Sequence, residues 1–196
     1  MTATRRAVGR TAAAGLAALE FALLLPMLVL LGLMVIDFAR ALQAQLILIN
    51  ITREGASLAA RASPYQTQTI MNSLAATTPP LDMPGNGMIY ITEVMGKREN
   101  DGSISNVVVN QYRWLGGGAY SPPSAAWSCG SWTAGKCTVP NPAPTANVMT
   151  GHLADGELIY AVEAFYRFSM FFGPMTLGSG ITTPQIGPDL QAITVM

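Results

Sequence analysis

The chain has 196 residues, which is room for one membrane anchor and one domain of about 130 residues, a common domain size. Half of the residues are hydrophobic and 11% are charged, whereas ordinary soluble chains carry about 25% charged residues. The formal net charge is zero, and the sequence lacks the basic patch or stripe that binds nucleic acid. We therefore expect a membrane-anchored protein with no nucleic-acid partner.

The first 15 residues form a basic segment. They contain Arg5, Arg6 and Arg10 and no acidic residue. Removing residues 1–15 would leave 8 basic and 11 acidic residues, and hence a net charge of −3. We interpret residues 1–15 as a leader that precedes the mature protein.

Residues 16–36 have the length and composition of a transmembrane segment. Glu20 is the only charged residue among these 21, which extend about 31 Å as a helix, close to a hydrocarbon thickness of about 30 Å. The arginines before the span, with only Arg40 close behind it, predict a cytoplasmic N-terminus and an extracytoplasmic C-terminus. Pro26 deletes one backbone hydrogen bond, so we expect it to kink the helix.

Residues 37–62 predict an amphipathic extension of this helix beyond the membrane. Asp37 and Arg40 lie three positions apart and can pair on one face. Six later positions follow helical spacing, namely Leu42, Leu46, Ile49, Arg53, Ala56 and Ala60. The stretch 50–61 is rich in small residues, which lets a neighbouring helix or sheet approach closely. We expect one helix from about Leu16 to Arg61.

A recognisable pattern lies where the leader meets the span. Gly15 is followed by four apolar residues and then by Glu20-Phe21, the pattern of the processing site of type IV pilin-like precursors, which are cut after the glycine. Four short motifs accompany it in order: Ala18–Ala22 (Ala-Leu-Glu-Phe-Ala), Leu25-Pro26, Asp37–Arg40 and Arg53–Ala56. From Gly15 to about Ala62 the chain thus resembles the TadE-like pseudopilins of the tight-adherence (Flp) pilus system.

The resemblance implies a function and a set of partners. A prepilin peptidase would cut between Gly15 and Leu16, and the product would be a minor, pilin-like component needed to assemble adhesive fibres. The implied location is the bacterial inner membrane, crossed once, or the pilus itself. The implied partners are the peptidase, the Flp major pilin, a second pseudopilin, the Tad assembly platform and membrane lipid.

The chemistry of Glu20 can be argued from the residues alone. A charged side chain at mid-bilayer costs roughly 2.5–3.5 kcal/mol, so an intramembrane carboxylate suggests a functional role. Cleavage would give Leu16 a new α-amino group, and in a bundle of staggered subunits a neighbour's amine could pair with Glu20 and set the register, with Phe21 beside it. The alternative is that Glu20 is interfacial and reaches the lipid headgroups.

A conventional secretory signal peptide is a competing interpretation. Arg5, Arg6 and Arg10 would form its basic region, Phe21–Ile36 its apolar region, and Ala39-Arg40-Ala41 its cut site. The apolar region has 16 residues, beyond the usual range of about 7–15. This interpretation also leaves Gly15 and Glu20 without a role.

Residues 63–196 predict a β-rich extracytoplasmic domain. We expect a short helix at 65–76, a hairpin of strands 88–95 and 104–114 joined through Asp101-Gly102, and further strands at 157–168 and 190–195. The third strand places one set of alternating side chains on one face: Leu158, Tyr160, Val162, Ala164 and Tyr166. The fold class is therefore α+β, with a small antiparallel sheet packed on the outer part of the long helix.

A stretch rich in Gly, Pro and Ser separates the strands, from residue 116 to 156. Loops of this length are uncommon in compact domains and are usually functional or disordered. Cys129 and Cys137 lie within it, and outside the cytoplasm a disulfide is their simplest state; free thiols and metal binding are the alternatives. A disulfide would stabilise the domain by about 2–3 kcal/mol in the chain-entropy model. Since His152 is the only histidine, a metal site is not expected.

Aromatic residues gather in two places in this domain. Trp127 and Trp132 flank the cysteines and fill the core or, alternatively, form an exposed contact surface. A second cluster surrounds Arg167 and comprises Phe165, Tyr166, Phe168, Phe171 and Phe172. It fits a packed strand end that precedes Pro174, with contact to the membrane interface or a neighbouring subunit as the alternative.

We find no pattern that predicts an enzyme or a cofactor. His152 and Asp155 are close in sequence, but a single loop histidine is usually only solvated. The glycines at 116–118 lack the helix and lysine of a phosphate-binding loop, and Gly178-Ser179-Gly180 lacks the flanks of a nucleophile elbow. The other function class that stays open is a single-span envelope protein whose outer domain binds a surface or ligand, without processing.

Overall fold

A computed structural model describes residues 8–61, 66–171, 176–177, 181–182 and 189–196, and the side chains of the helix from residue 18 on. Arg5 and Arg6 of the expected leader lie outside the described residues. The chain divides into two compact units. One comprises residues 1–40 and 170–186, and the other comprises residues 41–169 and 187–196, which we call the outer domain.

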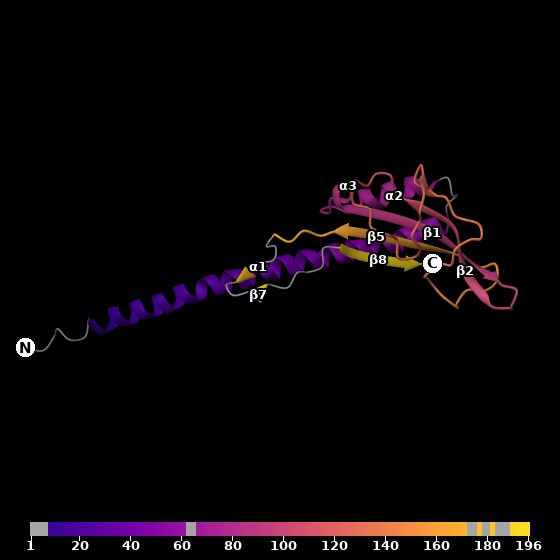
Figure 1. Ribbon diagram of the computed structural model, residues 1–196. Coiled ribbons are helices and arrows are strands. Elements are labelled where there is room, and N and C mark those ends of the chain that lie inside the picture. Colours follow the sequence, from indigo (N-terminus) through magenta and orange to yellow (C-terminus); the bar gives the residue numbers. More distant parts are fainter. Residues whose placement is uncertain (1–7, 62–65, 172–175, 178–180, 183–188) are drawn as a thin grey trace, which may run out of the picture. The chain divides into compact units, whose positions relative to one another are not determined.

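The long N-terminal helix, α1, runs from Val8 to Ala59 (Figure 1). The predicted continuity across residues 16–59 is confirmed, and Pro26 lies inside the helix. The helix starts earlier than the expected Leu16, because the alanine-rich stretch before Gly15 has high helix propensity and no proline. It ends two residues before the expected Arg61.

Of the six positions that follow helical spacing, the outer domain buries Ala56 and half-buries Ile49. Leu42 and Leu46 are 50% and 61% exposed, and Arg53 and Ala60 are also exposed. The buried positions are mainly small, namely Ala41, Ala44, Leu48, Ile51, Thr52, Gly55, Ala56 and Ala59. Small side chains let the helix backbone come close to the sheet, so this face packs inward and the two leucines point away.

The outer domain contains an antiparallel six-stranded sheet in the order β3-β4-β2-β1-β5-β8. Its strands are β1 (Gly87–Arg98), β2 (Ile104–Arg113), β3 (Trp132–Thr133), β4 (Lys136–Cys137), β5 (Leu158–Arg167) and β8 (Asp189–Val195). The predicted hairpin and the two later strands are thus confirmed. The remaining elements are helices α2 (Thr67–Ala76) and α3 (Met83–Asn86) and the short pair β6 (Thr176–Leu177) and β7 (Ile181–Thr182). Sequence reasoning missed β3, β4, β6 and β7, whose two-residue length gives no detectable alternation.

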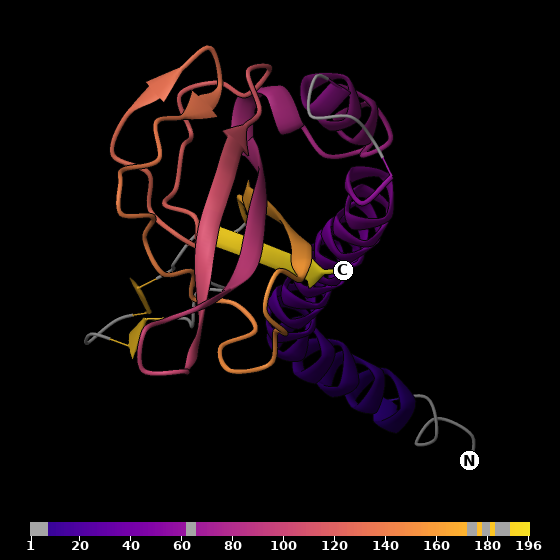
Figure 2. The same cartoon turned by 90° about the vertical axis from the view of Figure 1, so that its right-hand side faces the viewer.

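The outer half of α1 packs on one face of this sheet, as the fold-class prediction required. Figure 2 shows α1 and α2 on one side of the strands and the segment that follows β2 on the other. The shared core includes Leu48 and Ile51 of α1 with Ile89 of β1 and Val162 of β5. At the β8 edge, the Gln45 side chain donates to the backbone carbonyl of Gln191 at 2.8 Å.

Strand β5 is buried on both faces, whereas the sequence predicted one buried face. Val162 and Ala164 face the helix side, and the alternate residues Ala161 and Phe165 are buried as well. The second face is covered by the 115–156 segment, which forms its own core against the sheet. That core contains Val94, Val108, Ala126, Ala146, Val148, Leu153, Ile159 and Ala161.

Gly55 marks the closest approach between α1 and the rest of the outer domain. A Cβ atom on Gly55 would lie 2.8 Å from Leu74 Cδ1 and 3.0 Å from Val162 Cγ1. The predicted role of small residues in this stretch is therefore confirmed at this position.

We expect Gly55→Leu to destabilise the outer domain by about 1–3 kcal/mol, because the added atoms have no space between α1, α2 and β5. Glu54→Leu is the matched control, since Glu54 is the exposed neighbour on the same helix and a surface change of this kind costs within about 0.5 kcal/mol. Urea unfolding of the full chain in detergent micelles, followed by tryptophan fluorescence, measures both. Equal stabilities for the two variants would contradict the close packing.

Candidate functional site

The first half of α1 presents an uncovered apolar surface. Among the residues that the structure describes, one helix, α1, is long and apolar enough to cross a membrane, and its candidate span starts at Ala18. Phe21 and Leu23 are 59% and 74% exposed, and Glu20 is also exposed. A surface of this kind is unfavourable in water and favourable in lipid, so α1 has the properties of a single membrane anchor.

The predicted processing and register residues all lie in α1. Gly15 and Leu16 belong to its helical backbone, although their side chains are outside the described part. Glu20 follows Leu16 by four positions, so the two lie on the same face of the helix, about 6 Å apart along its axis. Slightly more than one turn of α1 therefore separates the Gly15–Leu16 bond from Glu20.

A cluster of three residues lies directly after the apolar span, and we call it the boundary cluster: Asp37, Arg40 and Phe171. The predicted Asp37–Arg40 pair is confirmed, with Arg40 donating to Asp37 Oδ1 at 3.2 Å. The same oxygen accepts the backbone N–H of Phe171 at 3.0 Å. The Arg40 guanidinium lies 3.9 Å from the centroid of the Phe171 ring. These contacts satisfy the Asp37 carboxylate, which is 3% exposed.

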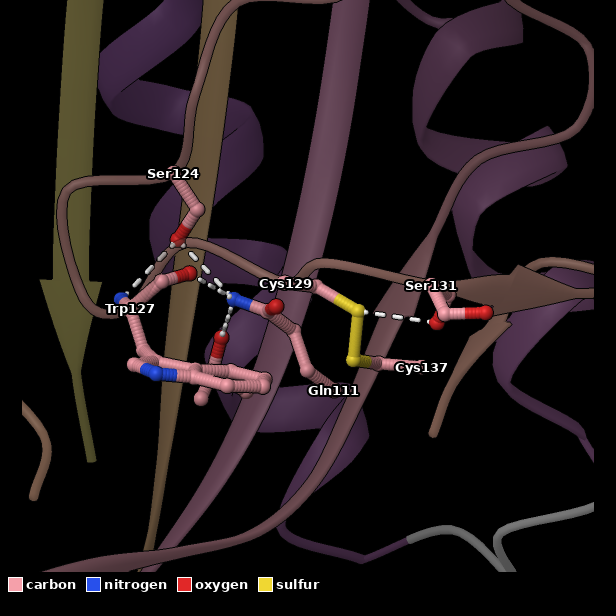
Figure 3. The surroundings of a disulfide bond; sticks show 7 residues. Gln111, Ser124, Trp127, Cys129, Ser131 and Cys137 are labelled. Atoms are coloured by element: carbon pink, nitrogen blue, oxygen red, sulfur yellow. Dashed lines mark hydrogen bonds between the residues drawn. A yellow bond between two sulfur atoms is a disulfide. The ribbon is translucent and has the colours of Figure 1, made fainter. Parts of the chain in front are cut away.

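The long loop after β2 is ordered by a disulfide. Cys129 and Cys137 are bonded, with their Cα atoms 6.0 Å apart (Figure 3). The disulfide encloses the β3–β4 hairpin, whose turn at Ala134 and Gly135 has positive φ angles of 48° and 79°. Neither the free-thiol nor the metal alternative for the two cysteines is observed.

A buried polar network joins this loop to the sheet, and sequence reasoning missed it. The Gln111 amide donates to Thr92 Oγ1 at 3.0 Å, to Ser124 Oγ at 3.0 Å and to the Trp127 carbonyl at 2.8 Å (Figure 3). Ser124 in turn donates to the carboxylate of Glu163. The network therefore links β1, β2 and β5 to the loop.

Glu163 is the ionisable group of this network and is fully buried on β5. Besides Ser124, the backbone N–H of Ala125 donates to its Oε1 at 2.8 Å. Burial raises the pKa of the Glu163 carboxyl, and the hydrogen bonds from Ser124, Ala125 and Ala126 oppose that rise. The sequence did contain one sign of this buried carboxylate, because Glu163 lies between apolar residues in the middle of a predicted strand.

The two tryptophans of the loop contribute to packing, as the core-filling interpretation predicted. Trp132 is half-buried against the main core, with its ring centroid 5.9 Å from that of Tyr90. Trp127 packs on the second core, beneath the loop. Phe165 also contacts Tyr90, edge to face at 5.9 Å.

The residues of the aromatic cluster around Arg167 differ in how far they are buried. Phe165 and Phe168 are buried and Tyr166 is half-buried, as expected of a packed strand end. Phe171 is instead 69% exposed. Phe172 and Pro174 lie outside the described residues.

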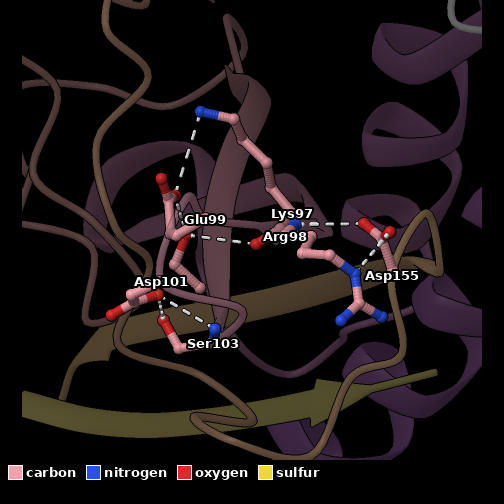
Figure 4. Close-up of polar contacts among 7 residues, drawn as sticks. Lys97, Arg98, Glu99, Asp101, Ser103 and Asp155 are labelled. Carbon is pink, nitrogen blue, oxygen red and sulfur yellow. Dashed lines mark hydrogen bonds and ion pairs between the residues drawn. The ribbon is translucent and has the colours of Figure 1, made fainter.

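Asp155 makes polar contacts with the last residue of β1, Arg98. Arg98 donates to Asp155 through its backbone N–H at 3.0 Å and its side chain at 3.3 Å (Figure 4). Nearby, the Ser103 hydroxyl donates to Asp101 at 2.6 Å and, together with the Ser103 backbone N–H at 2.9 Å, holds the pKa of that carboxyl below its usual value. Asp155 thus stabilises the β1 end. Within the described ranges, no group of three or more His, Cys, Asp or Glu residues could hold a metal ion.

Comparison with known proteins identifies the N-terminal part of the chain. The family model described as TadE-like protein matches residues 15–57. The match begins at Gly15 and ends near the end of α1, so it confirms the resemblance seen in the sequence over this segment. No curated protein matches the chain. No solved structure matches it either.

The raised pKa of Glu163 predicts a specific pH dependence of stability. The folded protein holds this proton to a higher pH than the unfolded chain, whose carboxyl has the ordinary value of 4.5. The contribution of Glu163 to stability is therefore fully present below about pH 4.5 and is lost as the pH rises through the folded-state pKa. The loss is about 1.4 kcal/mol for each unit by which the folded-state pKa exceeds the unfolded-state pKa.

Glu163→Gln should remove this contribution while keeping an acceptor oxygen for Ser124 and Ala125. The unfolding free energy of the wild type minus that of Glu163→Gln should fall as the pH is raised from 4 to 8, about the range in which a buried carboxyl titrates. Glu54→Gln, the same substitution at an exposed site on α1, is the matched control. A constant difference for Glu163→Gln would contradict the account.

Proposed function

We propose that this chain is the precursor of a membrane-anchored, TadE-like pseudopilin that is processed by a prepilin peptidase and needed to assemble a Tad-type adhesive pilus. One observation carries the proposal. The Gly15–Phe21 pattern lies at the start of the apolar half of α1, whose large side chains are exposed in the part of the chain that the structure describes, and the match to the TadE-like family starts at the same glycine. The chain is thereby expected to act as a structural component, not as an enzyme, and to need no cofactor.

Processing would change the chemistry of the helix start. Cleavage after Gly15 removes the basic residues of the leader and leaves a positively charged amine on Leu16, at the end of a helix that is apolar over its next 20 positions except for Glu20. An unpaired ion in lipid is costly, because it has lost its water. The Leu16 amine of one subunit and the Glu20 carboxylate of a staggered neighbour would therefore stabilise each other by pairing. Glu20 would then set the register between this subunit and other pilin-like subunits, with Phe21 packing beside it.

The same helix supports a proposed location and orientation of the protein in the membrane. An anchor crossing the inner membrane once, with the leader arginines in the cytoplasm, places the outer domain on the extracytoplasmic side. The disulfide between Cys129 and Cys137 supports this orientation, since disulfides persist outside the cytoplasm. We infer that the peptidase and the Tad assembly platform meet the chain at the membrane, and that the Flp major pilin and a second pseudopilin meet it during assembly.

The proposed cut site is tested by substituting its glycine. In cells that contain a prepilin peptidase, Gly15→Trp should abolish cleavage, because a bulky side chain would occupy the place of the residue that the peptidase reads. Gly9→Trp is the matched control, a glycine of the same leader away from the cut, and should be processed like the wild type.

Mass spectrometry of the mature N-terminus is the measurement. Leu16 supports the proposal. A start at Gln43 or nearby would instead support a secretory signal peptide, and an N-terminus at Met1 or Thr2 would leave an unprocessed anchor.

The role of Glu20 is tested separately from processing. Glu20→Ala should sharply reduce fibre formation while leaving membrane insertion intact or improved, because removing an intramembrane charge lowers the insertion cost by roughly 2.5–3.5 kcal/mol. Glu20→Gln, which keeps the shape and loses the charge, should fail in the same way if pairing with an amine is the cause. Glu54→Ala, an exposed glutamate of α1, should assemble normally. Normal fibre counts by electron microscopy for both Glu20 variants would overturn the register role.

A further inference from the structure

Phe171 stands out because it is a large aromatic side chain that the chain holds in place but does not cover. It is 69% exposed, yet its backbone N–H donates to Asp37 at 3.0 Å and Arg40 lies over its ring. An exposed residue that is positioned by a buried carboxylate is not a loose surface side chain. The arrangement calls for a partner on the open side of the ring.

The depth of Phe171 relative to the membrane follows from its bond to Asp37. Asp37 comes directly after Ile36, the last residue of a 21-residue span that matches the hydrocarbon thickness. The Phe171 backbone nitrogen lies within hydrogen-bond distance of that carboxylate, so Phe171 sits at the outer edge of the hydrocarbon. Aromatic side chains are enriched at this level, where the ring meets the acyl chains and its neighbours meet water.

The sequence after Phe171 is consistent with contact to lipid. Residues 168–188 carry no charge and include Met170, Phe171, Phe172, Met175, Leu177, Ile181 and Ile186. Charge-free stretches of similar length at 62–81 and 114–135 belong to the outer domain, which has its own cores. Residues 170–186 instead belong to the compact unit that contains the membrane half of α1.

We propose that Phe171, held by Asp37 and Arg40, is a second membrane contact of this protein and inserts its ring into the interface of the outer leaflet. The ring packs against the first methylenes of the acyl chains, and Arg40 lies on its headgroup side. Deeper insertion is disfavoured because the β6–β7 pair that follows gains no third strand from the described residues, and unpaired backbone groups need water. The contact lies on one side of α1 and therefore limits rotation of the helix about its own axis.

The proposal depends on α1 as a membrane anchor and not on processing or fibre assembly. The test uses the full precursor in phospholipid vesicles, with Phe171→Trp as the reporter. Trp114, Trp127 and Trp132 of the outer domain supply a constant background. Leu115→Trp is the matched control, because Leu115 is 54% exposed but lies in the outer domain.

The measurement is quenching by lipids that carry bromine either near the headgroup or near the chain end. The emission added by Phe171→Trp should be mostly lost with the shallow quencher and largely kept with the deep one, and the emission added by Leu115→Trp should be kept with both. Loss of neither emission overturns the proposal and assigns the ring to water or a protein neighbour. Stronger quenching by the deep lipid, or equal quenching of the two variants, also overturns it.

The positioning role of Asp37 is tested in the Phe171→Trp background. Asp37→Ala removes the acceptor of the residue-171 N–H and should reduce the shallow quenching, whereas Asp37→Asn keeps an oxygen acceptor and should restore most of it. Unchanged quenching in Asp37→Ala would show that Asp37 does not position the ring.

Discussion

The structure depends on one helix that has to be buried in two different environments. The backbone of α1 satisfies its own hydrogen bonds, which is the condition for crossing lipid, and its first half exposes large apolar side chains that only lipid or another helix can cover. The outer half of the same helix buries mostly small side chains against a sheet. The change occurs near Asp37 and Arg40, where the chain first places charged groups after the span. That second half packs on the sheet through the core that it shares with β1 and β5.

The outer domain is closed by two layers of different chemistry. On the helix side, apolar side chains of α1 and α2 pack on β1 and β5. On the other side, a long segment with little regular structure is fixed by the disulfide, by a second apolar core and by the network around Gln111 and Glu163. A buried carboxylate is costly unless it is fully hydrogen-bonded, so it accepts bonds from one particular loop conformation. The hydrogen bonds, the disulfide and the second core together fix the loop on the sheet.

The resemblance to TadE-like proteins is limited to α1 and does not extend to the sheet of the outer domain. The family match covers residues 15–57, all of which lie within α1. No solved structure matches the chain, so the outer domain is understood from its own contacts. Phe171 is distant from α1 in sequence, yet its backbone N–H donates to Asp37 of that helix.

The sequence by itself determined the long helix, its membrane half, the Asp37–Arg40 pair, the main strands and the disulfide, because each rests on local spacing or composition. Length and hydropathy define a span, alternation defines a strand, and two cysteines outside the cytoplasm pair. Only the tertiary structure decided which face of α1 is buried, that β5 is covered on both sides, and that Glu163 and Ser124 meet across 39 positions. These features depend on which segments approach one another in space. Helical spacing alone does not show whether the face with Leu42 and Leu46 or the face with small residues contacts the sheet.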